Sequence, residues 1–423
     1  MTHSTSPDSV VVVGAGQGGY QTAASLREHG YPGRITLISA EDALPYERPP
    51  LSKAYLKGEA DEAQLWLRPA TYYVRQSIDL VAGTVTEIDP AARTVRLADG
   101  SSYDYGHLVL ATGAGPRTLG VPGTGLRGVH TLRTSQDAAA LQSSLAGARR
   151  AVVVGAGFIG LEFAAVARQL GVEVTVVEAL DRPLARVASA RTAEHFTRLH
   201  RGAGTRLLFG RGVAALHGDG RSHVTAVELA DGSRLPADLV LVGIGVIPHT
   251  ELAAAAGLPV NGGITVDSHL LTDDPHISAI GDCAAFPQAR SGSRLRLESV
   301  QNAVGHAQSV ARRLTGTPGR YDELPWFWSD QFATTVQIAG FDEGHDTEVV
   351  LGDDPDAFSV LLFRGDELQA VESVNRPTDH LAARRLLTQG STLTPGDAAA
   401  PGFGLREHLR SLVRGGTEAP VPL

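Results

Sequence analysis

Cysteine is nearly absent from this chain of 423 residues, which contains only Cys283. A single cysteine excludes an internal disulfide, a Cys-x-x-Cys redox pair and a zinc site built on cysteines. Cys283 directly follows a Gly-Asp turn, where a small apolar residue packs well, and we favour that interpretation over a redox centre. The 15 histidines show neither an HExxH motif nor clustered ligand spacing, so we expect no metal site.

Long apolar runs and an excess of positive charge are also missing. No run approaches the roughly 18 apolar residues of a membrane-spanning helix. The net charge is −9, which lacks the positive excess typical of nucleic-acid binding. The first residues, MTHSTSPDS, lack the pattern of a signal peptide. We therefore expect a soluble, cytoplasmic protein of two or three domains, with no nucleic-acid and no membrane partner.

One stretch, from Ala151 to Ala179, has the full pattern of a dinucleotide fingerprint. An apolar strand leads into a glycine turn, a helix follows, and a second β-branched strand ends in an acid. Gly155 allows a tight turn, Gly157 lets a pyrophosphate approach the backbone, and Gly160 lets helix and strand pack closely. Glu178 ends the second strand, where a carboxylate accepts hydrogen bonds from an adenosine ribose. An ordinary glycine-rich turn is the alternative, and it explains neither the second strand nor the acid.

The same pattern occurs a second time near the N-terminus. An apolar strand at residues 10–13 leads into GAGQGG at residues 14–19, and a helix and a further strand follow. Ser39 occupies the place that Glu178 has in the other copy, and the carboxylates come slightly later. We take Glu41 as the candidate for the ribose of this first site, with a solvated loop acid as the alternative.

A loop with two prolines, LPYERPPLSKAYL at residues 44–56, follows the first copy. The prolines after an arginine hold the chain extended, and a helix is expected to start at Ser52 or Lys53. Arg48 suits a phosphate oxygen, and Lys53 suits the electron-rich edge of a ring. A surface loop with two ordinary cations is the alternative.

A second internal similarity indicates that the two halves share one plan. LADGSSYDYGHLVLATGAGP at residues 97–116 resembles LADGSRLPADLVLVGIGVIP at residues 229–248, at a constant offset of 132 residues. Each half is therefore expected to contain a βαβ unit, a β-ribbon (residues 80–97 in the first half) and a buried strand that ends in a glycine-rich turn. This predicts an α/β fold with two Rossmann-like dinucleotide-binding domains.

Beyond the second module, the segment ISAIGDCAA at residues 277–285 predicts a strand that ends in Gly-Asp. Asp282 then lies at the carboxyl end of a strand, a position that suits hydrogen bonding to a hydroxylated chain. A helix is expected from near Ser299, with Glu298 just before it, and its start points N–H groups toward an electron-rich ring. From residue 325 we predict a small α+β C-terminal domain, with strands at 335–338, 358–363 and 368–374 and a helix at 378–387.

Two dinucleotide sites in one chain favour a bound flavin dinucleotide paired with a nicotinamide dinucleotide that leaves. Hydride then passes from nicotinamide to flavin, and the cofactors supply the chemistry. Glu178 indicates NADH rather than NADPH, because a carboxylate repels a 2′-phosphate and binds a free 2′-hydroxyl. Arg182 and Arg186 lie near enough in the sequence to weaken that preference.

Together these motifs resemble the flavin- and NADH-dependent ferredoxin reductases that serve bacterial cytochrome P450 and aromatic dioxygenase systems. The resemblance covers nearly the whole chain and rests on VVVGAGQGG, RPPLSKAYL, LVLATGAGPR, VVVGAGFIGLE, GIGVIP, AIGDCA, ESVQNA, PWFWSDQ and VNRP, in that order. It implies a glutathione-reductase-like fold. The implied domains are an FAD-binding domain at 1–115 and 249–324, an NAD-binding domain at 116–248 and a C-terminal interface domain at 325–423.

The resemblance also implies roles for individual residues. Those expected to bind a tightly held FAD are Gly14, Gly16, Gly18, Glu41, Arg48, Lys53, Val85, Arg133, Asp282 and Val300. Those expected to bind NADH are Gly155, Gly157, Phe158, Ile159, Gly160 and Glu178. The expected catalytic residues are Lys53, Glu162, Glu298 and Trp328. An ion pair between Glu162 and Lys53 is expected near the flavin.

The electron acceptor implied by the resemblance is a [2Fe–2S] ferredoxin that supplies a cytochrome P450 or related oxygenase. A basic cluster in an acidic chain suits an acidic electron carrier, which is expected to dock near this cluster and Trp328. The cluster consists of Arg290, Arg294 and Arg296, and Arg312 and Arg313 lie on the expected helix that follows it. A solvated helix face is the alternative for these arginines.

Three other functions stay open at this point. A rubredoxin reductase or an NADH oxidase could use the same scaffold. An oxidase needs a peroxide-reactive cysteine near the flavin in the first part of the chain, and residues 1–115 contain none. An NADH-sensing flavoprotein resembling apoptosis-inducing factor would favour long basic or disordered insertions, which the sequence lacks.

Overall fold

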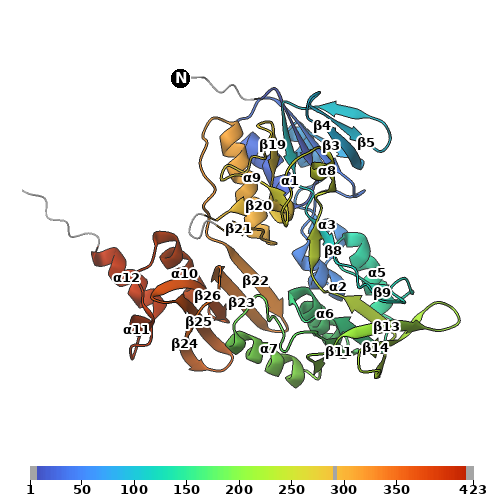
Figure 1. The fold of residues 1–423 in the computed structure, drawn as a ribbon, viewed down its shortest axis with the longest axis vertical. Helices are drawn as coiled ribbons and strands as arrows, with labels where there is room; N and C mark the ends of the chain where they lie inside the picture. The colour runs from blue at the N-terminus through green and yellow to red at the C-terminus, as the bar shows by residue number, and fades with distance from the viewer. Residues whose placement is uncertain (1–6, 289–292, 416–423) are drawn as a thin grey trace, which may run out of the picture. The chain divides into compact units, whose positions relative to one another are not determined.

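The computed structural model of the chain describes residues 7–288 and 293–415. These residues form two compact units. The first contains the described residues up to Leu51, Glu59–Arg117 and Val246–Glu323, and the second contains Ser52–Gly58, Thr118–Gly245 and the described residues from Leu324. Each unit contains a parallel sheet with helices, the α/β class that the sequence predicts (Figure 1). The predicted boundaries of the three domains stay predictions.

The parallel sheet of the first unit is built around β1, whose valines at 10–13 are all buried. These residues form a central strand because they are β-branched and apolar on both faces. Val13, at the end of β1, lies opposite Ile38 on one side and Leu110 on the other. The strands in spatial order are β19 (Ile277–Ala279), β7 (His107–Leu110), β1 (Ser9–Val13), β2 (Arg34–Ser39) and β3 (Ile78–Ala82).

The parallel sheet of the second unit repeats this plan. Its β10 takes the place of β1, and Val154 lies opposite Val177 and Val242. The equivalence confirms the prediction of two Rossmann-like folds in one chain. The strands in spatial order are β12 (Arg206–Leu208), β11 (Glu173–Val177), β10 (Arg150–Val154), β16 (Leu239–Val242) and β9 (Val129–His130).

Each unit also contains the predicted antiparallel ribbon. The prediction is wrong at the start of the first ribbon, because β3 pairs in parallel with β2 and so belongs to the main sheet. The ribbons are β4 (Val85–Asp89), β5 (Thr94–Leu97) and β6 (Ser102–Asp104), and β13 (Val213–Gly218), β14 (Val224–Leu229) and β15 (Arg234–Pro236). The other strands of the first unit are β8 (Ala114–Pro116), β17 (Val246–Pro248), β18 (Ile264–Thr265), β20 (Ala284–Pro287) and β21 (Arg294–Leu295).

Helices α1 and α9 pack side by side in the first unit (Figure 1). Helix α9 begins where the sequence predicts, because the Ser299 hydroxyl caps it by accepting a hydrogen bond of 3.1 Å from the N–H of Asn302. The helical segments are α1 (Gln17–Glu28), η1 (Pro49–Ser52, whose last residue belongs to the second unit), α3 (Glu62–Leu65), α4 (Ala70–Arg75), α8 (Glu251–Ala255), η2 (Gly281–Cys283) and α9 (Val300–Leu314).

Helix α6 follows β10 in the second unit and buries Phe163, Ala164 and Ala167 in its core. The helices that accompany the parallel sheet are α2 (Ala54–Lys57), α5 (Ser135–Leu145), α6 (Phe158–Gln169) and α7 (Ala190–Gly202). Within residues 7–288 and 293–415, no helix combines the length and the apolar character that crossing a membrane requires.

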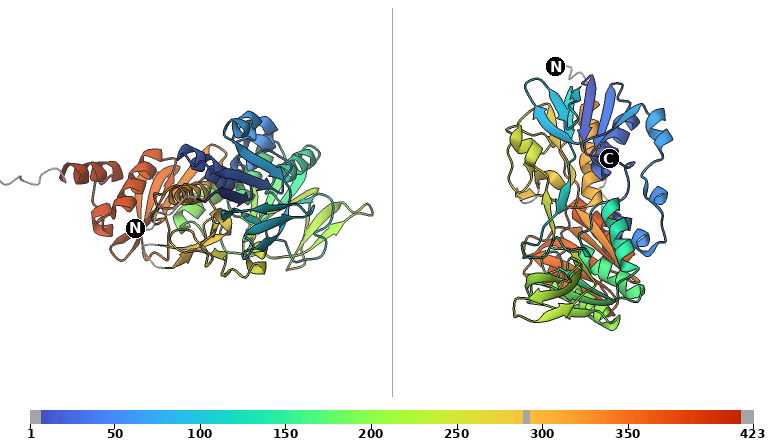
Figure 2. Two further views of the ribbon diagram at one scale, coloured as in Figure 1. Left: turned by 90° about the horizontal axis from the view of Figure 1, so that it is seen from above. Right: turned by 90° about the vertical axis from the view of Figure 1, so that its right-hand side faces the viewer.

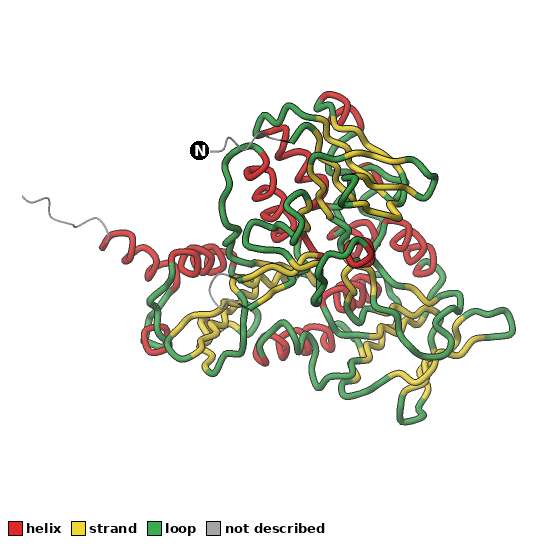
Figure 3. Tube along the Cα trace, turned by 45° about the horizontal axis from the view of Figure 1, so that its top comes forward, coloured by secondary structure: helices red, strands yellow, loops and turns green. Residues whose placement is uncertain are grey.

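The C-terminal part of the second unit is an antiparallel sheet with helices packed against it. Leu361, Val371 and Leu386 are fully buried in their shared core. The left-hand view of Figure 2 shows these helices, in red, beside the orange strands, and Figure 3 distinguishes the two by secondary structure. The strands in spatial order are β22 (Trp326–Gln331), β23 (Thr334–Gly340), β26 (Glu367–Val374), β25 (Ala357–Arg364) and β24 (Thr347–Asp354). The helices are α10 (Pro377–Gln389), α11 (Pro395–Ala398) and α12 (Leu405–Gly415).

The sequence predicts β23, β25, β26 and α10, and the structure adds β22 and β24. Both added strands lie at the edges of the sheet. An edge strand buries less of its surface than a central one, so its apolar pattern is weaker. The edge strand β24 accordingly has alternating partly buried and exposed residues.

Candidate functional site

Gly14 and Gly155 open the two glycine turns in the same conformation. Each has a φ of 104°, a region that residues with a Cβ avoid. A Cβ on Gly14 would overlap the carbonyl oxygen of Ala111, and one on Gly155 would overlap that of Gly243. Each turn therefore contacts the backbone just after the neighbouring strand, at Ala111 after β7 and at Gly243 after β16. Only glycine fits at these two positions.

The second glycine of each turn leaves open space at the start of a helix. Gly157 caps α6, and no heavy atom outside its neighbours lies within 4 Å of the place where its Cβ would be. Gly16 caps α1, where Arg48 is the nearest group, at 4.0 Å. Neither cap uses a side chain on the first-turn N–H groups. Both turns thus fit the pyrophosphate of a dinucleotide, which FAD and NADH each contain.

The third glycine of the first turn is Gly19, which the sequence-based site prediction omits. A Cβ on Gly19 would overlap the carbonyl oxygen of Gly14, as one on Gly160 would overlap that of Gly155. Gly18, which the prediction includes, has another environment: its Cβ would lie 3.3 Å from Ile280 and would touch α9. The spacing GxGxxG alone identifies Gly19, so the signal was present in the sequence.

Glu178 ties the end of β11 to the second glycine turn. Its Oε2 accepts a hydrogen bond of 2.7 Å from the N–H of Ala156, and its Oε1 accepts one of 2.9 Å from Leu180. The carboxylate is therefore held beside the turn, where the ribose of a dinucleotide would lie.

Glu41 lies in a pocket at the first glycine turn, which Gly16 also lines. Arg48 donates a hydrogen bond of 2.6 Å to its Oε1, and the Tyr46 hydroxyl donates one of 2.5 Å to its Oε2. The Arg48 guanidinium also lies over the Tyr46 ring, 5.2 Å from its centre. The structure therefore brings Glu41 and Arg48 together, and it adds Tyr46, which the sequence analysis missed.

The predicted ion pair between Lys53 and Glu162 is present. Lys53 Nζ lies 2.8 Å from Glu162 Oε2. The side chain of Glu162, on α6, is 3% exposed, and that of Lys53 is 23% exposed. The hydroxyls of Ser52 and Ser329 also donate to the Glu162 carboxylate, at 2.5 and 2.7 Å. These contacts satisfy a buried carboxylate that would be costly if left without partners.

The segment from Glu178 to the start of α7 is anchored at two further points. The N–H of Leu184 donates a hydrogen bond of 3.0 Å to the carbonyl of Ala156, in the glycine turn. Ser189 donates through its N–H and its hydroxyl to the carboxylate of Glu372 on β26, at 2.7 and 2.6 Å. The C-terminal sheet therefore fixes the end of the segment that begins at Glu178.

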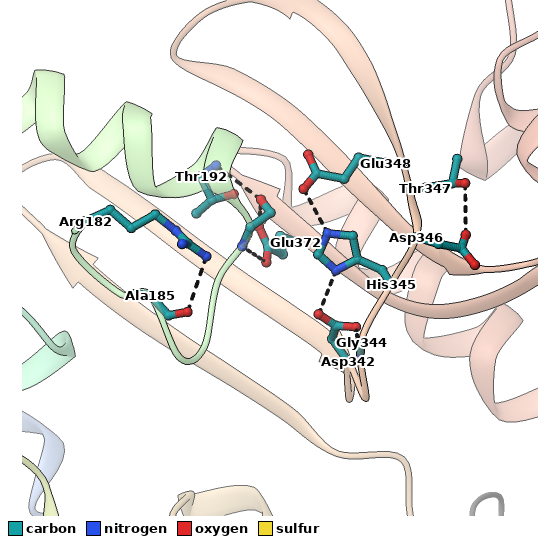
Figure 4. A network of polar contacts seen from close by, with 11 residues as sticks. Arg182, Ala185, Thr192, Asp342, Gly344, His345, Asp346, Thr347, Glu348 and Glu372 are labelled. Carbon is teal, nitrogen blue, oxygen red and sulfur yellow. Dashed lines mark hydrogen bonds and ion pairs between the residues drawn. The ribbon is translucent and has the colours of Figure 1, made fainter. Parts of the chain in front are cut away.

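Glu372 on β26 lies near a second polar group, at the connection between β23 and β24 (Figure 4). It is 1% exposed, and burial raises the pKa of its carboxyl. His345 lies between Asp342 and Glu348, with hydrogen bonds of 2.8 and 2.9 Å (Figure 4). Burial lowers the pKa of His345, but the two carboxylates outweigh it and raise the pKa above the ordinary value.

The chain before α9 brings Asp282, Arg296 and Glu298 together in the first unit. Arg296 donates to the backbone carbonyl of Asp282 at 3.2 Å and pairs with Glu298 at 2.7 Å. Val300 is the first residue of α9. The ring of His306, also on α9, accepts a hydrogen bond of 3.1 Å from the N–H of Gly281 and so holds the turn that contains Asp282.

Comparison with known proteins identifies the family. The model of the pyridine nucleotide-disulphide oxidoreductases matches residues 8–307, and the reductase C-terminal model matches residues 326–409. Rhodocoxin reductase of Rhodococcus erythropolis is 49% identical over 401 residues, which are 94% of this chain and 93% of that protein. The chain belongs to the ferredoxin reductases of this family.

Solved structures of other ferredoxin reductases have the same fold. The reductase for the CYP199A2 system from Rhodopseudomonas palustris matches with a TM-score of 0.93 and 48% identity, over 95% of this chain and 100% of that one. The covalent complex of putidaredoxin reductase with putidaredoxin matches with a TM-score of 0.93 and 39% identity, over 96% and 99% of the two chains.

Cys283, the single cysteine of this reductase, is fully buried. Its Sγ donates to the carbonyl of Ile280 at 3.2 Å, and burial raises the pKa of the thiol. These surroundings favour the packing role over a reactive thiolate. The chain contains no second cysteine with which Cys283 could form an internal disulfide.

Trp328 of the reductase lies on β22, with its ring 5.6 Å from that of Trp326. Phe327, which lies between the two tryptophans on the strand, packs against Phe158 at the start of α6, with 4.6 Å between ring centres. Ile159, beside Phe158, is 44% exposed. The structure thus joins the C-terminal sheet directly to the helix of the second glycine turn.

Two predicted cofactor residues lie away from the glycine turns in sequence. Val85 is buried at the start of β4 in the first unit. Arg133 lies in the second unit, just before α5, and its N–H donates to the Asp137 carboxylate at 3.0 Å.

The described arginines of the basic cluster, Arg294 and Arg296, make contacts within the protein. Arg290 lies outside the described residues. Arg294 donates to the backbone carbonyls of Val266 and Ala285, and Arg296 pairs with Glu298 as described above. Arg313 donates to the Ser278 hydroxyl at 2.6 Å, and burial lowers its pKa to about 10. Arg313 is therefore partly buried and bonded to Ser278, and the docking surface stays a prediction.

Proposed function

We propose that this reductase oxidises NADH and passes the electrons, through bound FAD, to a [2Fe–2S] ferredoxin that supplies a cytochrome P450 or a related oxygenase. When bound, FAD accepts a hydride and releases its electrons one at a time. The observation that carries the proposal is the pair of equivalent glycine turns with open phosphate positions in a chain whose one cysteine is buried. Without a dithiol of its own, the protein needs an external carrier for the electrons.

In this proposal the two turns hold different dinucleotides. The first turn binds the FAD pyrophosphate, Glu41 takes the adenosine ribose, and the turn of Asp282 takes the hydroxylated chain. The proposed FAD residues are Gly14, Gly16, Gly18, Glu41, Arg48, Lys53, Val85, Arg133, Asp282 and Val300. The proposed NADH residues are Gly155, Gly157, Phe158, Ile159, Gly160 and Glu178.

The proposed catalytic residues are Lys53, Glu162, Glu298 and Trp328. The Lys53 ammonium suits the electron-rich edge of the flavin, and Glu162 orients it through their ion pair of 2.8 Å. Glu298 contacts the nicotinamide carboxamide, held by its own pair with Arg296.

A preference for NADH over NADPH is supported by Glu178, whose carboxylate is fixed by two backbone N–H groups. A 2′-phosphate placed near this carboxylate would be repelled. Arg182 donates to the backbone carbonyl of Ala185 at 3.3 Å, which leaves it less available to a phosphate.

The ferredoxin is proposed to dock near Arg290, Arg294, Arg296 and Trp328. The R290E/R294E variant reverses two charges of this surface. Its KM for the ferredoxin should rise about tenfold and lose part of its dependence on salt. Flavin reduction by NADH alone should keep its rate. A ferredoxin KM and a salt dependence equal to those of the wild type would remove this surface from the proposal.

An anaerobic titration of the purified protein with NADH and with NADPH tests the function itself. We expect a yellow protein that NADH bleaches, and rapid reduction of cytochrome c only after a ferredoxin is added. A colourless protein that takes up no FAD contradicts the whole proposal. Rapid oxygen consumption without a ferredoxin indicates an NADH oxidase, and bleaching without any turnover indicates a sensor.

A further inference from the structure

Glu162 receives hydrogen bonds from two sides of the second unit. Ser52 and Lys53 reach it from the loop that precedes α2, at 2.5 and 2.8 Å. Ser329 reaches its other oxygen from β22 of the C-terminal sheet, at 2.7 Å. The two oxygens of the carboxylate are thus held by different segments, which fixes the plane of the carboxylate as well as its position.

The contact from Ser329 continues into the protein as a chain of buried polar groups. The Gln331 amide donates to Ser329 Oγ at 3.3 Å, and the ring of His200 on α7 lies 2.9 Å from Gln331 Oε1. Ser329, Gln331 and His200 are each at most 1% exposed. Four side chains from α7, β22 and α6 therefore form one continuous buried line that ends at Glu162.

In each hydrogen bond of this line, the donor is the residue farther from Glu162. Since Gln331 Oε1 only accepts, His200 Nε2 must donate, which assigns the tautomer. Burial lowers the pKa of His200, so the ring stays neutral and keeps that tautomer. The Gln331 amide then donates to Ser329, and the Ser329 hydroxyl proton is directed at Glu162 Oε1. The Phe332 ring packs edge-on against His200, with 5.2 Å between ring centres, and keeps its ring in place.

We propose that Ser329, Gln331 and His200 are positioning residues that fix the Glu162 carboxylate and, through it, the ammonium of Lys53. A lysine side chain has four carbons joined by rotatable bonds, and it loses considerable conformational entropy when it is held in one conformation. A Glu162 carboxylate that is fixed by hydrogen-bond donors on both oxygens restricts the positions that the Lys53 ammonium can occupy. Lys53 is the charged partner of Glu162 among the described contacts, and His200 is the titratable group at the far end of the line.

The lysine content of the chain makes this proposal directly testable. The sequence contains two lysines, Lys53 and Lys57. A protein labelled with ¹³C at the ε-carbon of lysine therefore gives two signals, and Lys57 is an internal control. In the FAD-loaded wild type, the two ε-protons of an immobilised Lys53 should have separate chemical shifts, and those of Lys57 should coincide.

The S329A variant breaks the line at its last link. We expect the two ε-proton shifts of Lys53 to merge and its signal to sharpen, and the Lys57 signal to stay unchanged. The S329T variant, which keeps the hydroxyl, should restore the wild-type Lys53 signal. The matched control is S359A, which removes another fully buried serine of the same sheet, one that bonds Ser373 and Asp379 instead. It should leave Lys53 as it is in the wild type.

The Q331L variant removes the second link and keeps Ser329, and it should shift the Lys53 signal in the same direction by a smaller amount. A Lys53 signal that is identical in the wild type, S329A and Q331L overturns the proposal. The role of Lys53 toward flavin rests on the proposed function, and stopped-flow reduction by NADH tests that role separately. In S329A the rate constant should fall about tenfold at an unchanged KM for NADH. A mobile Lys53 with an unchanged rate constant supports the positioning line and removes Lys53 from the proposed chemistry.

Discussion

Glu178 and Ala156 are joined by a hydrogen bond of 2.7 Å, which ties the acid at the end of β11 to the second glycine turn. The E178Q variant keeps an acceptor for this bond and removes the negative charge. Its ratio of kcat/KM for NADPH to kcat/KM for NADH should rise about tenfold, because the repulsion of the 2′-phosphate is lost. Steady-state kinetics with both coenzymes measure this ratio.

The control for E178Q is E173Q, which removes a charge at the other, exposed end of the same strand. It should leave the coenzyme ratio unchanged. If E178Q and E173Q gave the same ratio as the wild type, Glu178 would not determine the coenzyme.

The open position at Gly157 predicts a variant that folds normally but binds NADH poorly. In G157A the new methyl group meets no atom of the protein within 4 Å, but it occupies the place of the pyrophosphate. The KM for NADH should rise about tenfold or more, equivalent to about 1.4 kcal/mol of binding. The protein should stay yellow, because the first glycine turn is untouched. G147A, at another glycine with open surroundings, should have a normal KM, and an unaltered KM in G157A would contradict the placement of NADH.

The Lys53–Glu162 pair should behave as one unit in a double-mutant cycle. K53M leaves a carboxylate that is 3% exposed without its cation and should lower the free energy of unfolding by about 2 kcal/mol or more. The K53M/E162Q variant should be less destabilised than the sum of its single variants, with a coupling of about 1–3 kcal/mol. Urea unfolding of all four proteins gives this coupling, and additive effects would show that the pair contributes no interaction of its own.

His306 predicts a specific dependence of stability on acid. It is fully buried, and burial lowers its pKa to about 3, against about 6.5 in the unfolded chain. Below about pH 6.5, His306 is therefore protonated in the unfolded chain, but in the folded protein it stays neutral down to about pH 3. The stabilising contribution is complete above pH 6.5 and is lost as the pH falls toward 3.

Between pH 7 and pH 5 this titration should remove about 2 kcal/mol from the free energy of unfolding. In H306Q that loss should disappear, so the unfolding free energy should fall less between the two pH values than in the wild type. Urea unfolding at pH 7 and pH 5 measures the difference. The control is H29Q, at an exposed histidine, whose free energy of unfolding should depend on pH as in the wild type. The same wild-type dependence in H306Q would contradict the prediction, because it would mean that His306 titrates normally in the folded protein.

Local sequence patterns were sufficient for the framework of the fold. Apolar residues that are adjacent in sequence predict β1 and β10, and the glycines that follow allow the turns. The start of α9 depends on capping by Ser299. The constant offset between the two halves is itself enough to identify the repeat. The repeat also explains the equivalent places of the two strands, since β1 lies between β7 and β2 and β10 lies between β16 and β11.

Sequence alone determined that this chain has two dinucleotide folds, that the acid Glu178 follows the strand β11, and that a second cysteine for an internal disulfide is missing. Tertiary structure alone decided that Ser329 and Ser52 share Glu162 with Lys53, that Tyr46 bonds Glu41, and that Arg313 bonds Ser278. The physical reason is that a turn or a strand is encoded by adjacent residues. A hydrogen bond between distant segments exists only after packing has brought them together, and no local pattern records which partner a buried polar group finds.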